Sequence, residues 1–402
     1  MNVLWLTLGA PYPPDTGVRI RDYNLIRQVA QRHSVTLISL LYSRDEIASL
    51  ENLRRYCAEV DYVFMRPRSF GENASQFLLH LTSGRPPATY PFYYPEVTQK
   101  IRSVSKRNKP DIVQIEHSFL APYITAIPQN ACRTVLSLHN IGSRQYGSMR
   151  RMKTGFVNKC VWWLKWLSML GWETAWAGRF DQVISVSAAD RDLLLKSNPN
   201  LRVAVVPNGC DTRALQPLPE SAAGNKLLYI GTFGYPPNVD AVLHFTDCIL
   251  PLIRQQIRDV RLVVVGHRPP EAIRRLAERG EIILAPPTAD VLPYYREARI
   301  CVVPLRAGGG TRIKILEAMA LGRPVVSTRA GCEGLDVKSD EQLMIADTPA
   351  EFAQNVVQLL SDSWTRGRLV AMARSFVESR HDWSAIGSGV LHLYEQLLGY
   401  GG

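Results

Sequence analysis

The sequence predicts an α/β protein with two Rossmann-like domains, each built on a doubly wound parallel sheet. Short apolar runs alternate with longer helical patterns along all 402 residues. These runs are continuous in Val, Ile and Leu, which is typical of strands that helices cover on both faces. A chain of this length has room for two or three domains. We therefore expect two sheets with right-handed crossovers, facing each other, with ligands at the carboxyl ends of their strands.

The predicted strands fall into two sets. The first set spans 2–8, 35–41, 111–115, 134–138, 182–186 and 202–206. The second set spans 226–231, 261–265, 281–284, 300–304 and 324–327. Each set opens in a similar way, because the first strand is followed by a glycine and then by Pro13-Pro14-Asp15 or Pro236-Pro237-Asn238. In both places a rigid turn is predicted to lead into a helix cap.

The segment 205–225 is rich in Pro, Gly and Ala, which is typical of an interdomain linker. We place the N-terminal domain at 1–206 and the C-terminal domain at 207–382. The remaining segment, 383–402, has the spacing of a helix.

The composition indicates which class of binding partner and which cellular compartment to expect. The net charge of +11 favours an anionic partner, such as nucleic acid, anionic lipid or a phosphorylated small molecule. Seven scattered cysteines, none paired at metal-ligand spacing, favour buried thiols in a reducing compartment. The N-terminal apolar run has no basic segment before it, and no uncharged apolar stretch is long enough to span a bilayer. We expect a cytosolic protein.

The motif GGGTRIKILEAMALGRPVV, at 308–326, carries the main indication of function. Glycines let backbone N–H groups approach a ligand closely, and a helix N-terminus attracts anions. Two cations at this end oppose the helix dipole, and a bound pyrophosphate explains their placement. A carboxylate one turn later can accept hydrogen bonds from sugar hydroxyls. A glycine-rich turn with solvated charges is the structural alternative. The expected donor-binding residues here are Gly308, Gly309, Gly310, Thr311, Arg312, Lys314 and Glu317.

This motif resembles the donor-site signature of GT-B glycosyltransferases of the family 4 (group 1) type. The resemblance extends to the segments at 180–194, 205–212 and 229–245 and to the YPPDTG turn, and so spans nearly the whole chain. It implies transfer of a sugar from a nucleotide sugar, UDP- or GDP-linked, with retention of anomeric configuration. It also implies no catalytic metal, no further cofactor, and a last helix, at 383–402, that packs back on the first domain.

Two positions depart from the family pattern. Relatives often have a glutamate where this chain has Gly309, so contact to the transferred sugar would come from backbone N–H groups. Many relatives also carry an Arg and a Lys after the first strand of the second domain, whereas this chain has Gly231 and Thr232 there. We expect Arg312 and Lys314 to replace them, beside Gly231 and Thr232.

The amino-terminal half supplies the candidate catalytic residues. Glu116 and His117 end one predicted strand, and the resemblance places a histidine near this point close to the transferred sugar. Strand alternation lets only one of the two face the donor, and the sequence does not decide which. His139 and Asn140 end the next strand and match an HN element of the subgroup. Structural roles for these residues, as groups that bond to the backbone or cap a helix, remain open.

The acceptor is expected beside the first loop. The resemblance places the loop Gly9–Gly17 between donor and acceptor, so Asp15, Thr16, Gly17 and Arg19 are candidate contacts together with Asn140. Solvation of Arg19 and Arg21 is the alternative.

No metal site is expected. Asp190 and Asp192 form a D-x-D pattern, but Ser187 before them fits a helix N-cap. The eight histidines show no zinc-binding spacing.

The segment 150–177 is basic and rich in tryptophan. Such a helix lies well on an anionic bilayer, which would suit a lipid-linked acceptor and a peripheral place at the inner face of the cell membrane. Apolar residues occur on both faces, however. Trp162, Trp166, Met169 and Trp176 share one stripe with Glu173, and Trp163, Leu167 and Leu170 lie opposite, which also fits burial between domains.

The favoured hypothesis is a glycosyltransferase of cell-surface polysaccharide or glycolipid synthesis that acts on a glycan or lipid-linked acceptor. The alternatives are a nucleotide-sugar epimerase or hydrolase, and an inactive binding module on a membrane surface. Nucleic-acid binding is not favoured, because only 150–166 combines basic and aromatic residues.

Overall fold

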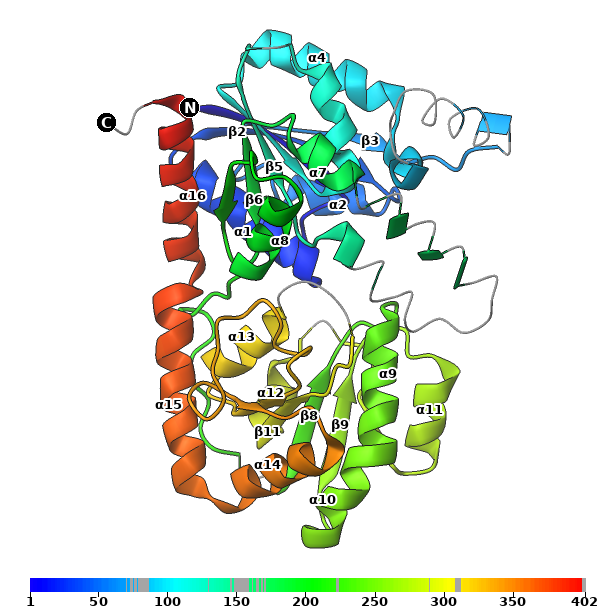
Figure 1. Cartoon of the computed structure of the whole chain (residues 1–402), viewed down its shortest axis with the longest axis vertical. Helices are drawn as coiled ribbons and strands as arrows, with labels where there is room; N and C mark the ends of the chain where they lie inside the picture. Colours follow the sequence, from blue (N-terminus) through cyan, green and yellow to red (C-terminus); the bar gives the residue numbers. More distant parts are fainter. Residues whose placement is uncertain are drawn as a thin grey trace. The chain divides into compact units, whose positions relative to one another are not determined.

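The computed structural model describes residues 1–69, 71–72, 75, 78, 87–128, 130–144, 147, 159–160, 162–163, 166–167, 169, 171–221, 224–288, 290–307 and 312–399. The chain divides into two compact units. Unit 1 comprises Met1–Pro207 and Ile386–Gly402, and unit 2 comprises Asn208–Ala385. Figure 1 shows both units, with most helices and several strands labelled.

Unit 1 contains one parallel sheet of seven strands among the described residues, in the order β3-β2-β1-β4-β5-β6-β7. Its buried strands are continuous apolar runs, as their cover on both faces requires. The strands are β1 (Asn2–Leu8), β2 (Ser34–Leu41), β3 (Glu59–Phe64), β4 (Ile112–Glu116), β5 (Arg133–Ser137), β6 (Gln182–Ser185) and β7 (Val203–Val205).

The helices of unit 1 follow from local caps and breaks. Thr16 caps α1, and Ser187 caps α8 through its hydroxyl. The helical segments are α1 (Gly17–Ala30), α2 (Glu46–Glu51), η1 (Pro87–Phe92), α4 (Pro95–Asn108), η2 (Ser118–Ala126), α7 (Trp172–Ala177) and α8 (Ala188–Ser197). The final helix, α16 (Trp383–Leu398), lies mostly in unit 1, where Arg133 Nε donates to Leu397 O at 3.1 Å.

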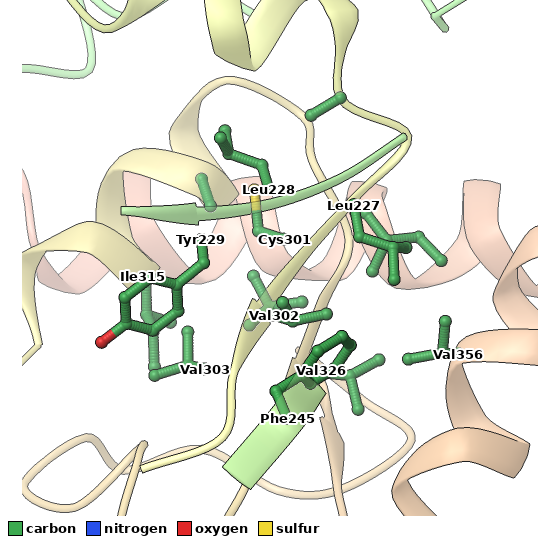
Figure 2. Packing of buried hydrophobic residues seen from close by; sticks show 14 of the residues in the cluster. Leu227, Leu228, Tyr229, Phe245, Cys301, Val302, Val303, Ile315, Val326 and Val356 are labelled. Atoms are coloured by element: carbon green, nitrogen blue, oxygen red, sulfur yellow. The ribbon is translucent and has the colours of Figure 1, made fainter. Parts of the chain in front are cut away.

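Unit 2 contains a parallel sheet of six strands among the described residues, in the order β10-β9-β8-β11-β12-β13. Side chains of β8, β11 and β12 form the centre of its core, which Figure 2 shows with Leu227, Val302 and Val326 labelled. The strands are β8 (Lys226–Ile230), β9 (Arg261–Val265), β10 (Ile283–Leu284), β11 (Ile300–Val303), β12 (Val325–Ser327) and β13 (Met344–Ile345).

The helical segments of unit 2 are α9 (Pro236–His244), η3 (Phe245–Ile249), α10 (Leu250–Gln256), α11 (Glu271–Glu278), α12 (Leu292–Glu297), α13 (Ile313–Ala320), α14 (Pro349–Ser361) and α15 (Ser363–Arg380). Two parallel sheets of alternating strands and helices confirm the predicted fold class.

The structure corrects three local expectations. The turn Pro13-Pro14-Asp15 leads to a cap at Thr16 rather than at Asp15. Asn238 lies inside α9 rather than at its cap. The predicted linker is fixed to unit 2 by hydrogen bonds, because Arg374 of α15 donates to the carbonyl oxygens of Thr212 and Leu215 at 2.8 and 2.5 Å.

Two strands were not predicted. β3 is an edge strand, and its sequence EVDYVF carries polar residues because one side of it stays accessible. β13 is only two residues long. All seven cysteines are free thiols. Within the described residues, no helix combines the length and the apolar character needed to cross a bilayer.

Candidate active site

The carboxyl end of β8 in unit 2 is packed too tightly for side chains. A Cβ on Gly266 would lie 2.0 Å from the carbonyl oxygen of Gly231, and a Cβ on Gly231 would lie 2.9 Å from Cγ of Asn238. Only glycine allows this close approach of backbone to backbone. Asn238 fixes the loop by donating to Thr232 O at 2.8 Å while it accepts from Tyr229 Oη at 2.8 Å. The predicted residues Gly231 and Thr232 therefore belong to a rigid turn.

Both predicted cations lie at the start of α13, and both interact with Tyr229 of β8. Arg312 is the N-cap residue of α13 and is 9 % exposed. Nζ of Lys314, in the first turn, lies 4.5 Å from the ring centroid of Tyr229. This ammonium nitrogen is shielded from solvent and has no hydrogen-bond partner among the residues the structure describes. A buried ammonium group without an acceptor is unfavourable, so this position suits an anion that supplies one.

Burial shifts both titratable groups of α13. It lowers the pKa of Lys314 to about 7, and the charge of Arg312 acts in the same direction. Burial also raises the pKa of Glu317 to about 7. Glu317 lies one turn after Arg312 and contacts the hydroxyl of Tyr295. The alternative of solvated charges is wrong for Arg312 and Lys314. Gly308, Gly309, Gly310 and Thr311 lie outside the described residues.

In unit 1 Glu116 and His117 differ in burial and in hydrogen bonding. Glu116 is fully buried and accepts from Gln114 Nε2 at 2.6 Å. His117 follows β4 with a φ of 68°, in the left-handed region, and is half-buried. Its Nε2 is shielded and has no hydrogen-bond partner among the described residues. Of the two side chains, that of His117 therefore has a nitrogen available for a hydrogen bond, whereas Glu116 already accepts one.

His139, at the end of β5, contacts residues from two other elements. Its Nε2 lies 2.8 Å from Glu116 Oε2 and 3.2 Å from Asp22 Oδ1. Its ring is stacked on that of His117, with centroids 3.9 Å apart. The structure thus brings Glu116, His117 and His139 together, whereas Asn140 is half-buried with no contact to them recorded.

The predicted acceptor loop is held by ion pairs. Thr16 Oγ1 accepts from the backbone of Arg19 at 3.5 Å. The guanidinium of Arg19 contacts Asp15 at 3.2 Å and Glu46 at 2.8 Å. Gly17 begins α1 and is exposed. The alternative of solvated arginines is wrong, because Arg19 is paired and Arg21 is fully buried, with Nη1 donating to Pro207 O at 3.0 Å.

Sequence reasoning missed Asp22 and Tyr229. Asp22 lies three and four residues before Leu25 and Ile26, on the buried face of α1, so helical spacing could have placed it inside. Tyr229 sits in an apolar strand and gave no such indication.

The tryptophan-rich segment divides by exposure where the structure describes it. Met169 and Trp176 are buried in the core of unit 1, and Glu173 is buried, accepting from Gly142 N at 2.8 Å. Trp163 and Leu167 are 45 % and 40 % exposed. One stripe thus reaches the core through Met169 and Trp176, with Trp162 and Trp166 half-buried, and the other reaches solvent. Leu170 and 148–158 lie outside the described residues.

Asp190 is part of a helix start, as predicted. Its backbone N–H donates to Ser187 Oγ at 3.1 Å. Another group, Asp22, His117 and His139, has ligand atoms within 4.8 Å of one another.

Two family models match the chain along most of its length. The Glycosyltransferase Family 4 model matches residues 16–214, and the Glycosyl transferases group 1 model matches residues 224–362. The former covers Thr16, Gly17, His117 and His139, and the latter covers the turn after β8 and α13.

Three relatives illustrate the similarity. An uncharacterized 44.6 kDa protein in the cps region of Klebsiella pneumoniae is 20 % identical and aligns with 97 % of this chain and 98 % of its own. A phosphatidyl-myo-inositol mannosyltransferase of Mycobacterium tuberculosis is 29 % identical over 214 residues, 49 % of this chain and 54 % of its own. This chain thus matches about half of that enzyme's length.

Among solved structures, Anabaena HepE in complex with UDP has a TM-score of 0.68 with 16 % identity, over 98 % of this chain and 100 % of its own. The likeness in fold extends over both units. With two family models matched in sequence order, the chain belongs to the family 4, group 1 glycosyltransferases and has their GT-B fold.

Proposed function

We propose that this glycosyltransferase moves a sugar from a nucleotide sugar to a hydroxyl of a glycan or lipid-linked saccharide, with retention of configuration. The observation that carries the proposal is the pair of cations beside the turn after β8. Arg312 and Lys314 converge near Tyr229, and Lys314 has its ammonium shielded from water. A nucleoside diphosphate supplies the acceptor that the ammonium group of Lys314 lacks among the described residues, beside a second positive charge on Arg312.

Each group has an assigned role at the donor. Arg312 and Lys314 bind the two phosphates, and Glu317 accepts hydrogen bonds from hydroxyls of the sugar or ribose. The rigid turn at Gly231 and Thr232 offers backbone groups close to the diphosphate. The positive charges of Arg312 and Lys314 neutralise the departing diphosphate, so the proposal requires no divalent cation.

The chemical step breaks the bond between the anomeric carbon and the diphosphate oxygen. The acceptor oxygen forms its new bond on the same face, and its proton passes to the departing phosphate. Retention follows without a covalent enzyme intermediate. His117, with its unused Nε2, is assigned to a hydroxyl of the transferred sugar.

The relatives support the choice of substrates. HepE is recorded in complex with UDP, which supports a UDP-linked donor, with GDP as the second choice. The name of the mannosyltransferase relative supports a lipid-linked acceptor, and the cps region of the Klebsiella relative supports a polysaccharide pathway. The acceptor is assigned to the loop of Asp15, Thr16, Gly17 and Arg19 with Asn140. The protein would act in the cytoplasm, with peripheral contact at the membrane.

Thermal shift with UDP, GDP, ADP and their sugar conjugates tests the donor site. A ligand at a hundred times its Kd stabilises the protein by about 2.7 kcal/mol. Arg312→Ala and Lys314→Ala should each weaken binding by roughly ten- to a hundredfold, since a charge-assisted hydrogen bond contributes about 1.5–3 kcal/mol. Arg275→Ala is the matched control, because Arg275 pairs only with Glu271 on the surface of α11. No shift with any nucleotide would refute the proposal.

A product assay separates the activities. Transfer needs both donor and acceptor, should continue in EDTA, and should leave the anomeric configuration unchanged by NMR. A changed nucleotide sugar formed from donor alone would indicate an epimerase, and free sugar would indicate a hydrolase.

A further inference from the structure

Four ionisable side chains are buried together in unit 1. Arg21, Asp22 and Glu116 are 0 %, 1 % and 0 % exposed, and His139 is 6 % exposed. They come from α1, the end of β4 and the end of β5. Such a group persists in a core only where its charges compensate one another.

The charges compensate when His139 is protonated. Asp22 and Glu116 carry two negative charges, Arg21 carries one positive charge, and an imidazolium supplies the second. Nε2 of His139 lies at hydrogen-bond distance from Glu116 Oε2, so this nitrogen bears a hydrogen that it donates there, while Asp22 Oδ1 at 3.2 Å adds a second negative charge beside it. Burial alone would lower the pKa of His139, but the two carboxylates outweigh it and raise the pKa to about 9.

His117 lies directly on this cation. The ring centroids are 3.9 Å apart, with an angle of 29° between the ring planes. Two positive rings at this distance would repel each other. Burial and then the charges of His139 and Arg21 hold the pKa of His117 well below its usual value, although Asp22 lies close enough to oppose them.

A metal ion is the competing interpretation of the same atoms. Asp22, His117 and His139 offer ligand atoms within 4.8 Å of one another. However, stacked imidazole rings direct their in-plane lone pairs side by side and not toward one point. Nε2 of His139 already lies at a hydrogen-bond distance of 2.8 Å from Glu116 Oε2, so this nitrogen carries a hydrogen and has no lone pair to offer a metal ion.

We infer that Asp22 and Glu116 hold His139 as a permanent imidazolium, and that this cation keeps the stacked His117 neutral. His117 then forms a hydrogen bond with a sugar hydroxyl as a neutral imidazole. It does not act as a general acid. Asp22, Glu116 and His139 are positioning residues, in place of the direct catalytic role first expected for Glu116 and His139. The role of His117 at the sugar rests on the proposed function, whereas the charge states of the two rings do not.

The charge states can be measured without a substrate. The full chain is labelled with ¹⁵N,¹³C-histidine, and its ring signals are followed from pH 5.5 to 8. The His117→Gln and His139→Gln variants assign the two sets of signals. We expect His139 to keep the shifts of an imidazolium throughout and His117 to keep those of a neutral ring. A titration of His117 near 6.5, or a neutral His139 at pH 7, would overturn the inference.

His139→Gln tests the coupling between the rings. The glutamine can still donate to Glu116, but the cation is gone. The pKa of His117 should then rise by about one unit or more. Asp22→Asn should instead lower the pKa of His139. His392→Gln is the control, since His392 is exposed on α16, and it should change neither ring. An unchanged His117 in a folded His139→Gln variant, checked by circular dichroism, would overturn the inference.

Two more measurements distinguish a failure of the inference from a failure of the proposed function. Zn²⁺ that shifted both sets of ring signals at one equivalent would replace the inference with a metal site. If transfer is detected, kcat/KM should show no titration of His117 from pH 6 to 8 in the wild type. An acidic limb should appear in His139→Gln. If no transfer is detected, the proposed function fails while the ring titrations still decide the inference.

Discussion

The ammonium group of Lys314 lies 4.5 Å from the ring centroid of Tyr229 and is shielded from solvent. Since burial lowers the pKa of this lysine to about 7, most of it is neutral at pH 8. A bound diphosphate would raise the pKa again. We therefore predict that UDP binding at pH 8 takes up close to one proton and that affinity falls as the pH rises above 7.

Calorimetry in buffers of different ionisation enthalpy measures this uptake. Lys314→Met should bind UDP more weakly and lose most of the proton uptake. UDP binding by the wild type without any uptake would show that Lys314 does not meet the phosphates.

The glycine turn predicts a sharp contrast between two positions. Gly266→Ala would push a Cβ against the carbonyl oxygen of Gly231, so the turn must shift. We expect the variant to lose about 1–3 kcal/mol of stability and to bind UDP poorly. At Gly234, in the loop after β8 that contains Gly231, an added Cβ meets nothing within 4 Å, so Gly234→Ala should behave as the wild type. Urea unfolding and thermal shift compare the two. Equal behaviour of both variants would contradict the close approach.

The stability of unit 1 should depend on pH through His139. Its pKa in the folded chain, about 9, lies above the ordinary value of 6.5. The stabilisation is therefore complete below pH 6.5 and is lost as the pH rises through 9. We expect a decrease on the order of 2–3 kcal/mol between these values. Urea unfolding at pH 6.5, 7.5 and 9 measures it. His139→Gln should lose this slope, and an identical slope in both proteins would contradict the assignment.

The exposed stripe of the tryptophan-rich segment predicts weak binding to anionic vesicles. Trp163 and Leu167 reach solvent next to a basic stretch of sequence. Replacing both by serine should reduce co-sedimentation with phosphatidylglycerol vesicles severalfold. Trp364→Ser is the control, because Trp364 is 73 % exposed but belongs to unit 2. Unchanged sedimentation of the double variant would exclude this stripe as the contact.

The fold was predictable because its main determinants are local. A parallel strand with both faces covered is mostly apolar, so β8, β9 and β11 stand out in the sequence. β3 was not predicted, because an edge strand keeps polar residues on its accessible side. Helix starts were predictable where a side chain caps the backbone, as at Ser187.

The candidate site was only partly predictable. Arg312 and Lys314 are two residues apart at one helix start, so the sequence shows them together. Asp22, Glu116 and His139 come from three separate segments, and their contacts exist only after the sheet has formed. Strand alternation could not choose between Glu116 and His117, because the left-handed backbone at His117 breaks the alternation.

Tyr394 of α16 donates a hydrogen bond to Gln114, which in turn donates to Glu116. The polar core of unit 1 therefore includes a residue near the end of the chain, separated from the rest of the unit by all of unit 2. A ribosome has translated the entire second unit before it adds Tyr394. Unit 1 consequently cannot mature during its own synthesis, and the first domain made is the last to be completed.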